Sequence, residues 1–185
     1  PRRMPASNLL GRYDNFPTSI HGTAKFTYQI STQQLQQAML NAFYQLNQQV
    51  CDLKNVTRAS PANCQVTFEL GIAEEVTFNF LDKEEYERLQ TCLKQNASVF
   101  RILDFFCATR YHIICADGKR KPLRFDYNLL RFSFYRRIME IFIVHERGIQ
   151  RIPLEDLITF LTQQINKGLK QKGLKTLATK ALTTL

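Results

Sequence analysis

Residues 111–145, YHIICADGKRKPLRFDYNLLRFSFYRRIMEIFIVH, contain the pattern that decides the fold. Apolar and aromatic residues form three runs of strand length, and short polar segments separate the runs. Asp117-Gly118 is a strong signal for a two-residue hairpin turn, because such turns need residues that tolerate positive φ angles. The pattern therefore predicts consecutive antiparallel strands over residues 111–116, 123–134 and 138–145.

Shorter strands are expected on both sides of this stretch. Residues 24–30, 65–70 and 75–81 have the alternating pattern of half-buried strands, and the last two segments meet around Gly71. After residue 145 the chain turns, and residues 149–152 are expected to pair back briefly. Most of the predicted strands are therefore joined in hairpins, which pair antiparallel.

Three segments have the start signals and apolar spacing of amphipathic helices. The clearest begins at Ser31, which forms a capping box with Gln34. Its apolar positions are Leu35, Ala38, Met39, Ala42, Phe43, Leu46 and Val50. A second helix is expected over residues 83–95 after Asp82, and a third begins at Pro153, a residue suited to the first turn of a helix.

Two further segments have helical spacing. In residues 99–108 the apolar positions fit a helix, but the same residues could open a buried strand; we favour the helix. In the tail the apolar residues are Leu174, Leu177, Ala178, Ala181, Leu182 and Leu185. The expected docking residues of this basic amphipathic helix, on the same domain or on a second copy of the chain, are Leu174, Leu177, Ala181 and Leu185. The absence of an aromatic anchor argues against a membrane surface.

Together these segments predict an α+β fold: an antiparallel sheet built mainly of hairpins, packed on one face by two to four helices, with a C-terminal amphipathic helix. We expect an irregular N-terminal segment over residues 1–20, a single domain over residues 21–168 and the tail over residues 169–185. A helix-grip arrangement around a cavity is the alternative, and no residue selects between the two.

The excess positive charge is confined to the second part of the chain. Residues 1–100 contain 9 Lys or Arg and 9 Asp or Glu, whereas residues 101–185 contain 16 and 7, which accounts for the whole net charge of +9. Such asymmetry points to an anionic partner. The expected contact residues are Lys119, Arg120, Lys121, Arg124, Arg131, Tyr135, Arg136 and Arg137.

Strand alternation groups these residues by face. It places Arg124 with Asp126 and Asn128, and it places Arg131 with Tyr135. One face of the strand would be core, and the other would present guanidinium groups and a phenol. Arginine forks bind phosphate, and exposed aromatic rings stack on unpaired bases. The alternative is an ordinary solvated face with a basic hairpin tip.

Common catalytic and cofactor motifs do not occur in the chain. There is no G-x-S-x-G, no P-loop and no dinucleotide-binding glycine motif, and His145-Glu146 lacks the second histidine of H-E-x-x-H. The five cysteines form no C-x-x-C pair, which predicts free thiols and an intracellular, for example cytoplasmic, location. We expect no cofactor, no metal and no catalytic residue; a pair of Cys107 or Cys115 with His112 is the nearest alternative.

These patterns favour a non-catalytic binding module whose basic second half contacts nucleic acid or an acidic protein partner. The alternative is a small-ligand-binding or enzymatic domain with a cavity between the sheet and the helices. No pattern in the sequence identifies a ligand or an oligomeric state.

Overall fold

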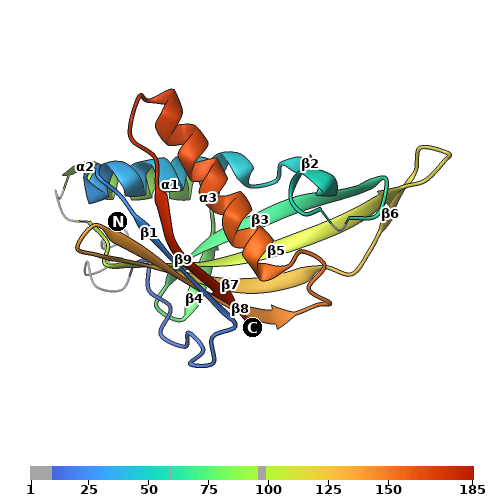
Figure 1. Ribbon diagram of the computed structural model, residues 1–185, viewed down its shortest axis with the longest axis horizontal. Helices are drawn as coiled ribbons and strands as arrows, with labels where there is room; N and C mark the ends of the chain where they lie inside the picture. Colours follow the sequence, from blue (N-terminus) through green and yellow to red (C-terminus); the bar gives the residue numbers. More distant parts are fainter. Residues whose placement is uncertain (1–9, 59, 96–98) are drawn as a thin grey trace.

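The computed structural model describes residues 10–58, 60–95 and 99–185. Within these ranges the chain forms one sheet of nine strands and three α-helices (Figure 1). In chain order the elements are β1 (Gly22–Thr27), α1 (Thr32–Leu46), β2 (Val50–Asp52), the 3-10 helix η1 (Leu53–Asn55), β3 (Cys64–Glu74), β4 (Thr77–Phe80), α2 (Lys83–Gln95), β5 (Ile102–Ile114), β6 (Arg120–Pro122), β7 (Asp126–Tyr135), β8 (Ile138–Arg147), α3 (Leu154–Gln171) and β9 (Ala178–Thr184). The predicted α+β class is confirmed.

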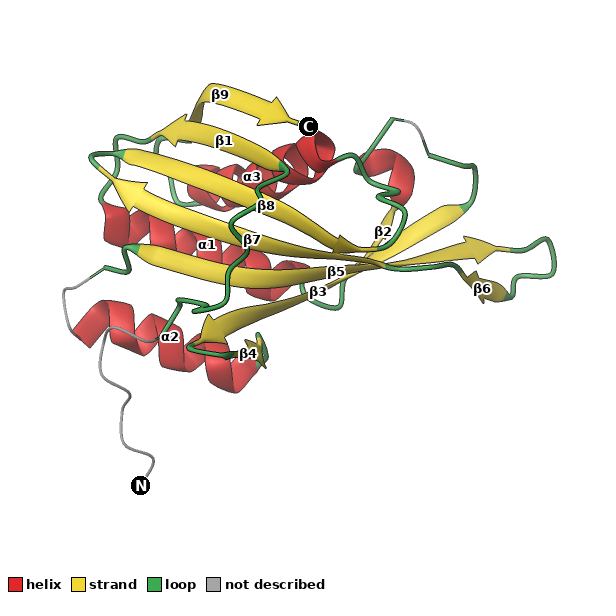
Figure 2. Cartoon of the chain, turned by 90° about the horizontal axis from the view of Figure 1, so that it is seen from below, coloured by secondary structure: helices red, strands yellow, loops and turns green. Residues whose placement is uncertain are grey.

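The sheet has the order β2-β3-β5-β7-β8-β1-β9, with β4 added to β3 and β6 added to β5. Its named strand pairs are all antiparallel. Four of these pairs, β2–β3, β3–β4, β5–β6 and β7–β8, join consecutive strands, as hairpins do. Figures 1 and 2 show α1 and α3 lying across one face of the sheet, with α2 beside α1 at the margin. We call this covered side the helix face and the opposite side the outer face.

Helix α1 begins where the sequence predicts. The Ser31 hydroxyl oxygen accepts from the Gln34 N–H at 3.1 Å, and the Gln34 side-chain oxygen accepts from the Ser31 N–H at 3.2 Å, which is the predicted capping box. The ring of Phe43 is fully buried against the sheet, with centroid distances of 5.1 Å to Phe105 and 5.6 Å to Phe132. These three rings fill the space between α1 and the middle strands.

The helix favoured for residues 99–108 is wrong. From Ile102 onward this segment is the first half of β5, which pairs with both β3 and β7. Leu103 and Phe105 are buried on the helix face, and Asp104 is buried on the outer face. Because β5 is covered on both faces here, it lacks the clean alternation of a half-buried strand, and its apolar run also fits helical spacing.

The tail is a strand rather than a helix. A C-terminal amphipathic helix is present, but it is α3, and the residues of β9 pair with the edge of β1. Leu177 is buried and Leu174 packs against the core, whereas Ala181 and Leu185 are exposed. The edge of β1 lies far away in the sequence, so the local spacing of the tail contains no sign of this pairing. Residues 149–152, expected to pair back, instead form the loop before α3.

Part of the N-terminal segment crosses the outer face. Gly11 donates its N–H to the carbonyl oxygen of Ala73 in β3 at 2.8 Å, and its carbonyl oxygen accepts from the Asp104 N–H in β5 at 2.6 Å. From Leu10 onward the described part of this segment is irregular and is attached to the sheet through isolated bridges. The remainder of the predicted segment, residues 1–9, lies outside the described residues.

Candidate nucleic-acid interface

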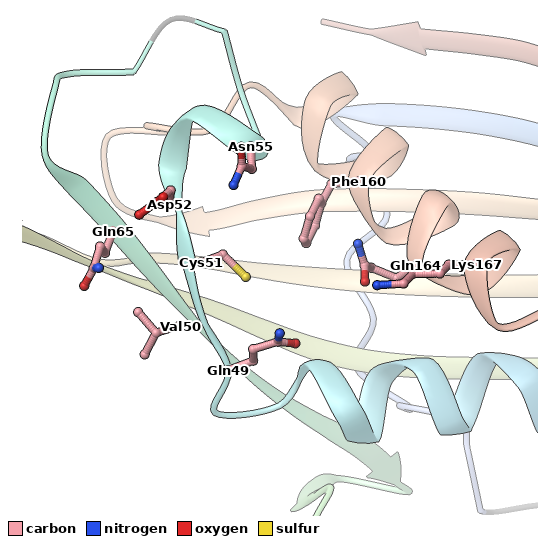
Figure 3. Close-up of a pocket in the computed structure, with 9 residues that line it drawn as sticks. All are labelled: Gln49, Val50, Cys51, Asp52, Asn55, Gln65, Phe160, Gln164 and Lys167. Carbon is pink, nitrogen blue, oxygen red and sulfur yellow. The ribbon is translucent and has the colours of Figure 1, made fainter.

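A polar cavity of about 370 Å³ lies at the margin of the helix layer, between β2 and α3 (Figure 3). The ring of Phe160 forms its apolar wall and stacks on Phe68, with 5.2 Å between centroids. The other lining residues are Gln49, Val50, Cys51, Asp52, Asn55, Gln65, Gln164 and Lys167. Burial and the neighbouring Asp52 carboxylate raise the pKa of Cys51, which keeps this thiol protonated and weakly nucleophilic near neutral pH.

The layer between the sheet and α1 is packed with side chains. Phe43, Phe105 and Phe132 are fully buried there. A second hollow of about 430 Å³ is lined by Gln37 of α1, by residues of α2 and by Lys172. The two hollows therefore lie at the margins of the helix layer. A small-ligand-binding or enzymatic domain was expected to have its cavity between the sheet and the helices, and neither hollow lies in the centre of that layer.

The basic hairpin, which we define as residues 112–124, projects from one end of the sheet beyond the helices (Figures 1 and 2). Its turn lies where the sequence predicts but contains three residues, since Cys115 donates its N–H to the carbonyl oxygen of Lys119 at 2.8 Å. Gly118 adopts a φ of 79° in this turn, a conformation that favours glycine. The cations of the basic hairpin are all exposed: Lys119, Arg120, Lys121 and Arg124.

These four cations form no ion pair with any part of the chain that the structure describes. Arg120 donates to the side-chain oxygen of Gln65 at 2.9 Å, which orients the guanidinium without neutralising it. Asp117 is the single acidic residue of the hairpin, and its carboxylate accepts from the Lys119 N–H at 3.0 Å. The hairpin therefore presents a net positive surface to solvent.

An exposed aromatic ring lies at the base of the basic hairpin. Phe125 is 41% exposed, and the guanidinium carbon of Arg110 lies 5.4 Å from its ring centroid. Arg110 is held by Glu69 of β3, with 2.7 Å between Nε and Oε1. The sequence analysis did not select Phe125 or Arg110 as site residues. The two residues are close because β5 pairs with β7. Only a comparison of the apolar–polar alternation in both strands could have suggested this pairing from the sequence.

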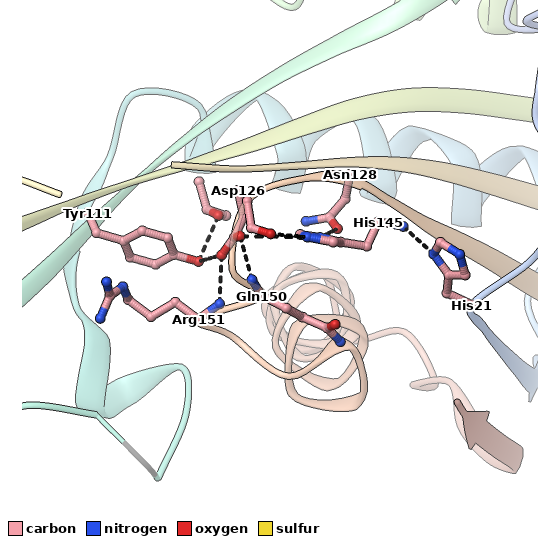
Figure 4. A network of polar contacts seen from close by, with 9 residues as sticks. His21, Tyr111, Asp126, Asn128, His145, Gln150 and Arg151 are labelled. Atoms are coloured by element: carbon pink, nitrogen blue, oxygen red, sulfur yellow. Dashed lines mark hydrogen bonds and ion pairs between the residues drawn. The ribbon is translucent and has the colours of Figure 1, made fainter. Parts of the chain in front are cut away.

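A buried carboxylate fixes the backbone beside this ring (Figure 4). Asp126 accepts hydrogen bonds from the Tyr111 hydroxyl at 2.7 Å and from the backbone N–H groups of Gln150 and Arg151 at 2.7 and 2.8 Å. These bonds join β5, β7 and the loop before α3. The expectation that Asp126 and Asn128 share an exposed polar face with Arg124 is wrong, because both are buried on the helix face. Tyr111 of β5 and the loop before α3 supply the partners of Asp126, and His145 of β8 supplies that of Asn128.

Arg131 is engaged within the fold. Its Nε and Nη2 donate to the two carboxylate oxygens of Asp104 at 2.8 Å each, and Nη2 also donates to the carbonyl oxygen of Tyr13 at 3.2 Å. The guanidinium carbon lies 4.3 Å from the ring centroid of Phe16. Arg131 therefore attaches the N-terminal segment to the outer face of the sheet.

Tyr135, Arg136 and Arg137 lie at the opposite end of the sheet from the basic hairpin. Strand β7 has 10 residues, and a rise of about 3.3 Å per residue separates its two ends by roughly 30 Å. Arg136 lies 5.0 Å from the ring centroid of Tyr135, and Arg137 donates to the carbonyl oxygens of Gln29 and Ile30. The fold therefore keeps the four hairpin cations together and separates them from the other predicted contact residues.

Comparison with known proteins gives no match. No protein family, no curated protein and no solved structure is similar to this chain. None of the helices in the described part of the chain is long and apolar enough to cross a membrane.

The pair of Cys107 with His112 is not formed; the histidine and carboxylate that lie close together are His145 and Asp126, with 3.9 Å between Nε2 and Oδ1 (Figure 4). Cys107 lies on the helix face of β5 and His112 on its outer face, so the two side chains point apart. Burial raises the pKa of Cys107 to about 12. All five cysteines are free, and residues 10–58, 60–95 and 99–185 contain no group of three His, Cys, Asp or Glu residues that could hold a metal ion.

Proposed function

We propose that this protein is a non-catalytic binding module whose basic hairpin contacts the phosphates of a nucleic acid. The observation that carries the proposal is the group of four exposed cations on a projecting hairpin, which no carboxylate of the described residues neutralises. Guanidinium and ammonium groups donate directly to phosphate oxygens, and the release of condensed counterions favours the complex.

The shape and composition of the basic hairpin favour nucleic acid over an acidic protein. A two-stranded ribbon is narrow enough to enter the major groove of a duplex or to follow a single strand. Residues 116–122, ADGKRKP, form the tip and contain no large apolar side chain. Interfaces between proteins usually depend on buried aromatic or aliphatic anchors at their centre, and this tip offers none.

Replacing Lys119, Arg120, Lys121 and Arg124 together by alanine tests the proposal. Binding of labelled single- and double-stranded oligonucleotides, measured by fluorescence anisotropy across a range of salt concentrations, should weaken for all sequences alike, because phosphate contacts do not read bases. Each lost phosphate contact lowers the log–log salt slope by about 0.9 on duplex DNA and about 0.7 on a single strand. Loss of four contacts should therefore lower the slope by about 3.6 on duplex DNA and by about 2.8 on a single strand.

A matched control removes the same number of charges elsewhere. Replacing Lys167, Lys170, Lys172 and Lys175, near the end of α3, lowers the net charge by the same amount and should leave most of the affinity and the salt slope intact. Equal weakening by both variants would mean that binding reflects net charge rather than the hairpin. If no oligonucleotide binds at low salt while polyglutamate does, the partner is an acidic polypeptide and the proposal is rejected.

A further inference from the structure

On the basis of this proposed function, we infer that Phe125 is a stacking platform for an unpaired base, so that the ligand of the basic hairpin is a single-stranded nucleic acid. A large apolar ring that is 41% exposed loses the free energy it would gain from burial, and Phe125 lies at the point where the hairpin leaves the sheet. A base stacked on this ring would leave its phosphates within reach of the neighbouring Arg124.

The surroundings of the ring suit a base. The Arg110 guanidinium lies over the ring at 5.4 Å and is held in place by Glu69, so its position does not depend on a ligand. A planar guanidinium stacks on bases as an aromatic ring does. Arg110 and Phe125 therefore form a paired stacking surface next to the phosphate-binding cations of the hairpin.

The backbone that carries the ring is rigid. Gly148 approaches so closely that an added Cβ would lie 2.5 Å from the Phe125 carbonyl oxygen and 2.8 Å from the Asp126 Cα. Asp126, the next residue along the chain, is held by hydrogen bonds from Gln150, Arg151 and the Tyr111 hydroxyl (Figure 4). A platform that is fixed before binding loses little conformational freedom when a base stacks on it.

The bases of a duplex already stack on one another, so a duplex would have to unstack a base before it could use this platform. Single-stranded binding should therefore depend on Phe125, and duplex binding should depend on the hairpin cations alone. Stacking on an aromatic side chain corresponds to an affinity change of about 10-fold or more per base.

The test compares Phe125→Ala with Tyr135→Ala. Tyr135 is also an exposed aromatic residue beside an arginine, at 65% exposure and 5.0 Å from Arg136, but it lies at the far end of the sheet. We expect Phe125→Ala to weaken binding of a single-stranded 12-mer by about 10-fold. The salt slope should stay unchanged because no phosphate contact is lost. Duplex binding should be unaffected, and Tyr135→Ala should match the wild type for both oligonucleotides.

A second variant reports the contact directly. The chain contains no tryptophan, so Phe125→Trp introduces a single indole. Its fluorescence should be quenched by a saturating single-stranded oligonucleotide and not by a duplex of the same length. The stacking platform is rejected if Phe125→Ala binds as well as the wild type and the Phe125→Trp emission stays constant. If the four-cation variant also loses binding, the proposal that the hairpin binds phosphates is retained. If the wild type binds neither oligonucleotide, the proposed function itself fails.

Discussion

Arg131 and Asp104 face each other across β7 and β5, and both carboxylate oxygens of Asp104 accept hydrogen bonds from the guanidinium. Asp104 is fully buried, and this burial raises its pKa, although the hydrogen bonds from Arg131 and from the Tyr13 N–H act in the opposite direction. The two residues are 27 positions apart in sequence. Inspection of the basic segment alone therefore groups Arg131 with the exposed arginines, whereas the strand pairing makes it a structural residue.

Replacing Arg131 by alanine should destabilise the fold without changing the interface. The variant leaves the Asp104 carboxylate buried without its counter-charge, and we expect the free energy of unfolding to fall by about 3–5 kcal/mol in urea denaturation. The double variant Asp104→Ala/Arg131→Ala removes both charges and should recover part of this loss. The affinity of folded Arg131→Ala for oligonucleotides should equal that of the wild type. A variant of normal stability that binds oligonucleotides poorly would place Arg131 in the interface instead.

Helix α1 and the tail have the same apolar spacing, yet one is a helix and the other a strand. Both sequences repeat apolar residues at i, i+3, i+4, i+7, i+8 and i+11. In α1 a capping box starts the helix, and the apolar positions from Leu35 to Leu46 are buried. Val50, which was expected on the same helix face, lies beyond the helix in β2 and is exposed. The tail is rich in threonine, a β-branched residue that favours strands, and the edge of β1 offers it backbone hydrogen bonds. Spacing therefore predicts α1 correctly and the tail incorrectly, because strand pairing is not a local property.

Deleting residues 178–185 should remove a strand and leave the helices intact. Circular dichroism at 222 nm should keep its helical signal, because the deleted residues lie in β9. The melting temperature should fall and self-association should rise in analytical ultracentrifugation, since the deletion exposes the edge of β1. A marked loss of helical signal on deletion would show that the tail is helical in solution.

Two leucines of the tail provide a matched comparison at the level of side chains. Leu177 is buried, and Leu177→Ala should cost about 2 kcal/mol of unfolding free energy. Leu185 is 92% exposed, and Leu185→Ala should have no measurable effect. Equal effects of the two substitutions would contradict the docking of the tail described above.

At the scale of the whole molecule, the excess charge of the second half occupies separate places in the fold. Four cations lie on the basic hairpin, the pair Arg136 and Arg137 lies at the opposite end of the sheet, and the lysines numbered 167–175 lie near the end of α3. The sequence was sufficient to locate the hairpin and its cations. It was not sufficient to separate these groups or to bring Arg110 beside Phe125, because both depend on how the antiparallel strands are paired.

The same pairing places the Tyr111 hydroxyl of β5 against the Asp126 carboxylate of β7, and this buried pair should make the stability of the whole protein depend on alkaline pH. Burial raises the pKa of Tyr111, and the Asp126 carboxylate raises it further. An unfolded tyrosine releases its proton near pH 10, whereas the folded protein retains it. The contribution of Tyr111 is therefore complete below about pH 10 and is lost as the pH rises further, by up to about 1.4 kcal/mol per pH unit.

Tyr111→Phe should separate this effect from other alkaline titrations. At pH 7 the variant should be less stable by about 1–3 kcal/mol, because the buried Asp126 carboxylate loses the hydrogen bond from the Tyr111 hydroxyl. Above about pH 10 its stability should decline less steeply than that of the wild type, because one proton fewer is released on unfolding. Urea denaturation from pH 7 to 11 measures both quantities, and Tyr135→Phe, at an exposed position, serves as the control. Parallel declines of wild type and Tyr111→Phe would show that Tyr111 ionises as readily in the folded protein as in the unfolded chain, which a phenol buried beside a carboxylate cannot do.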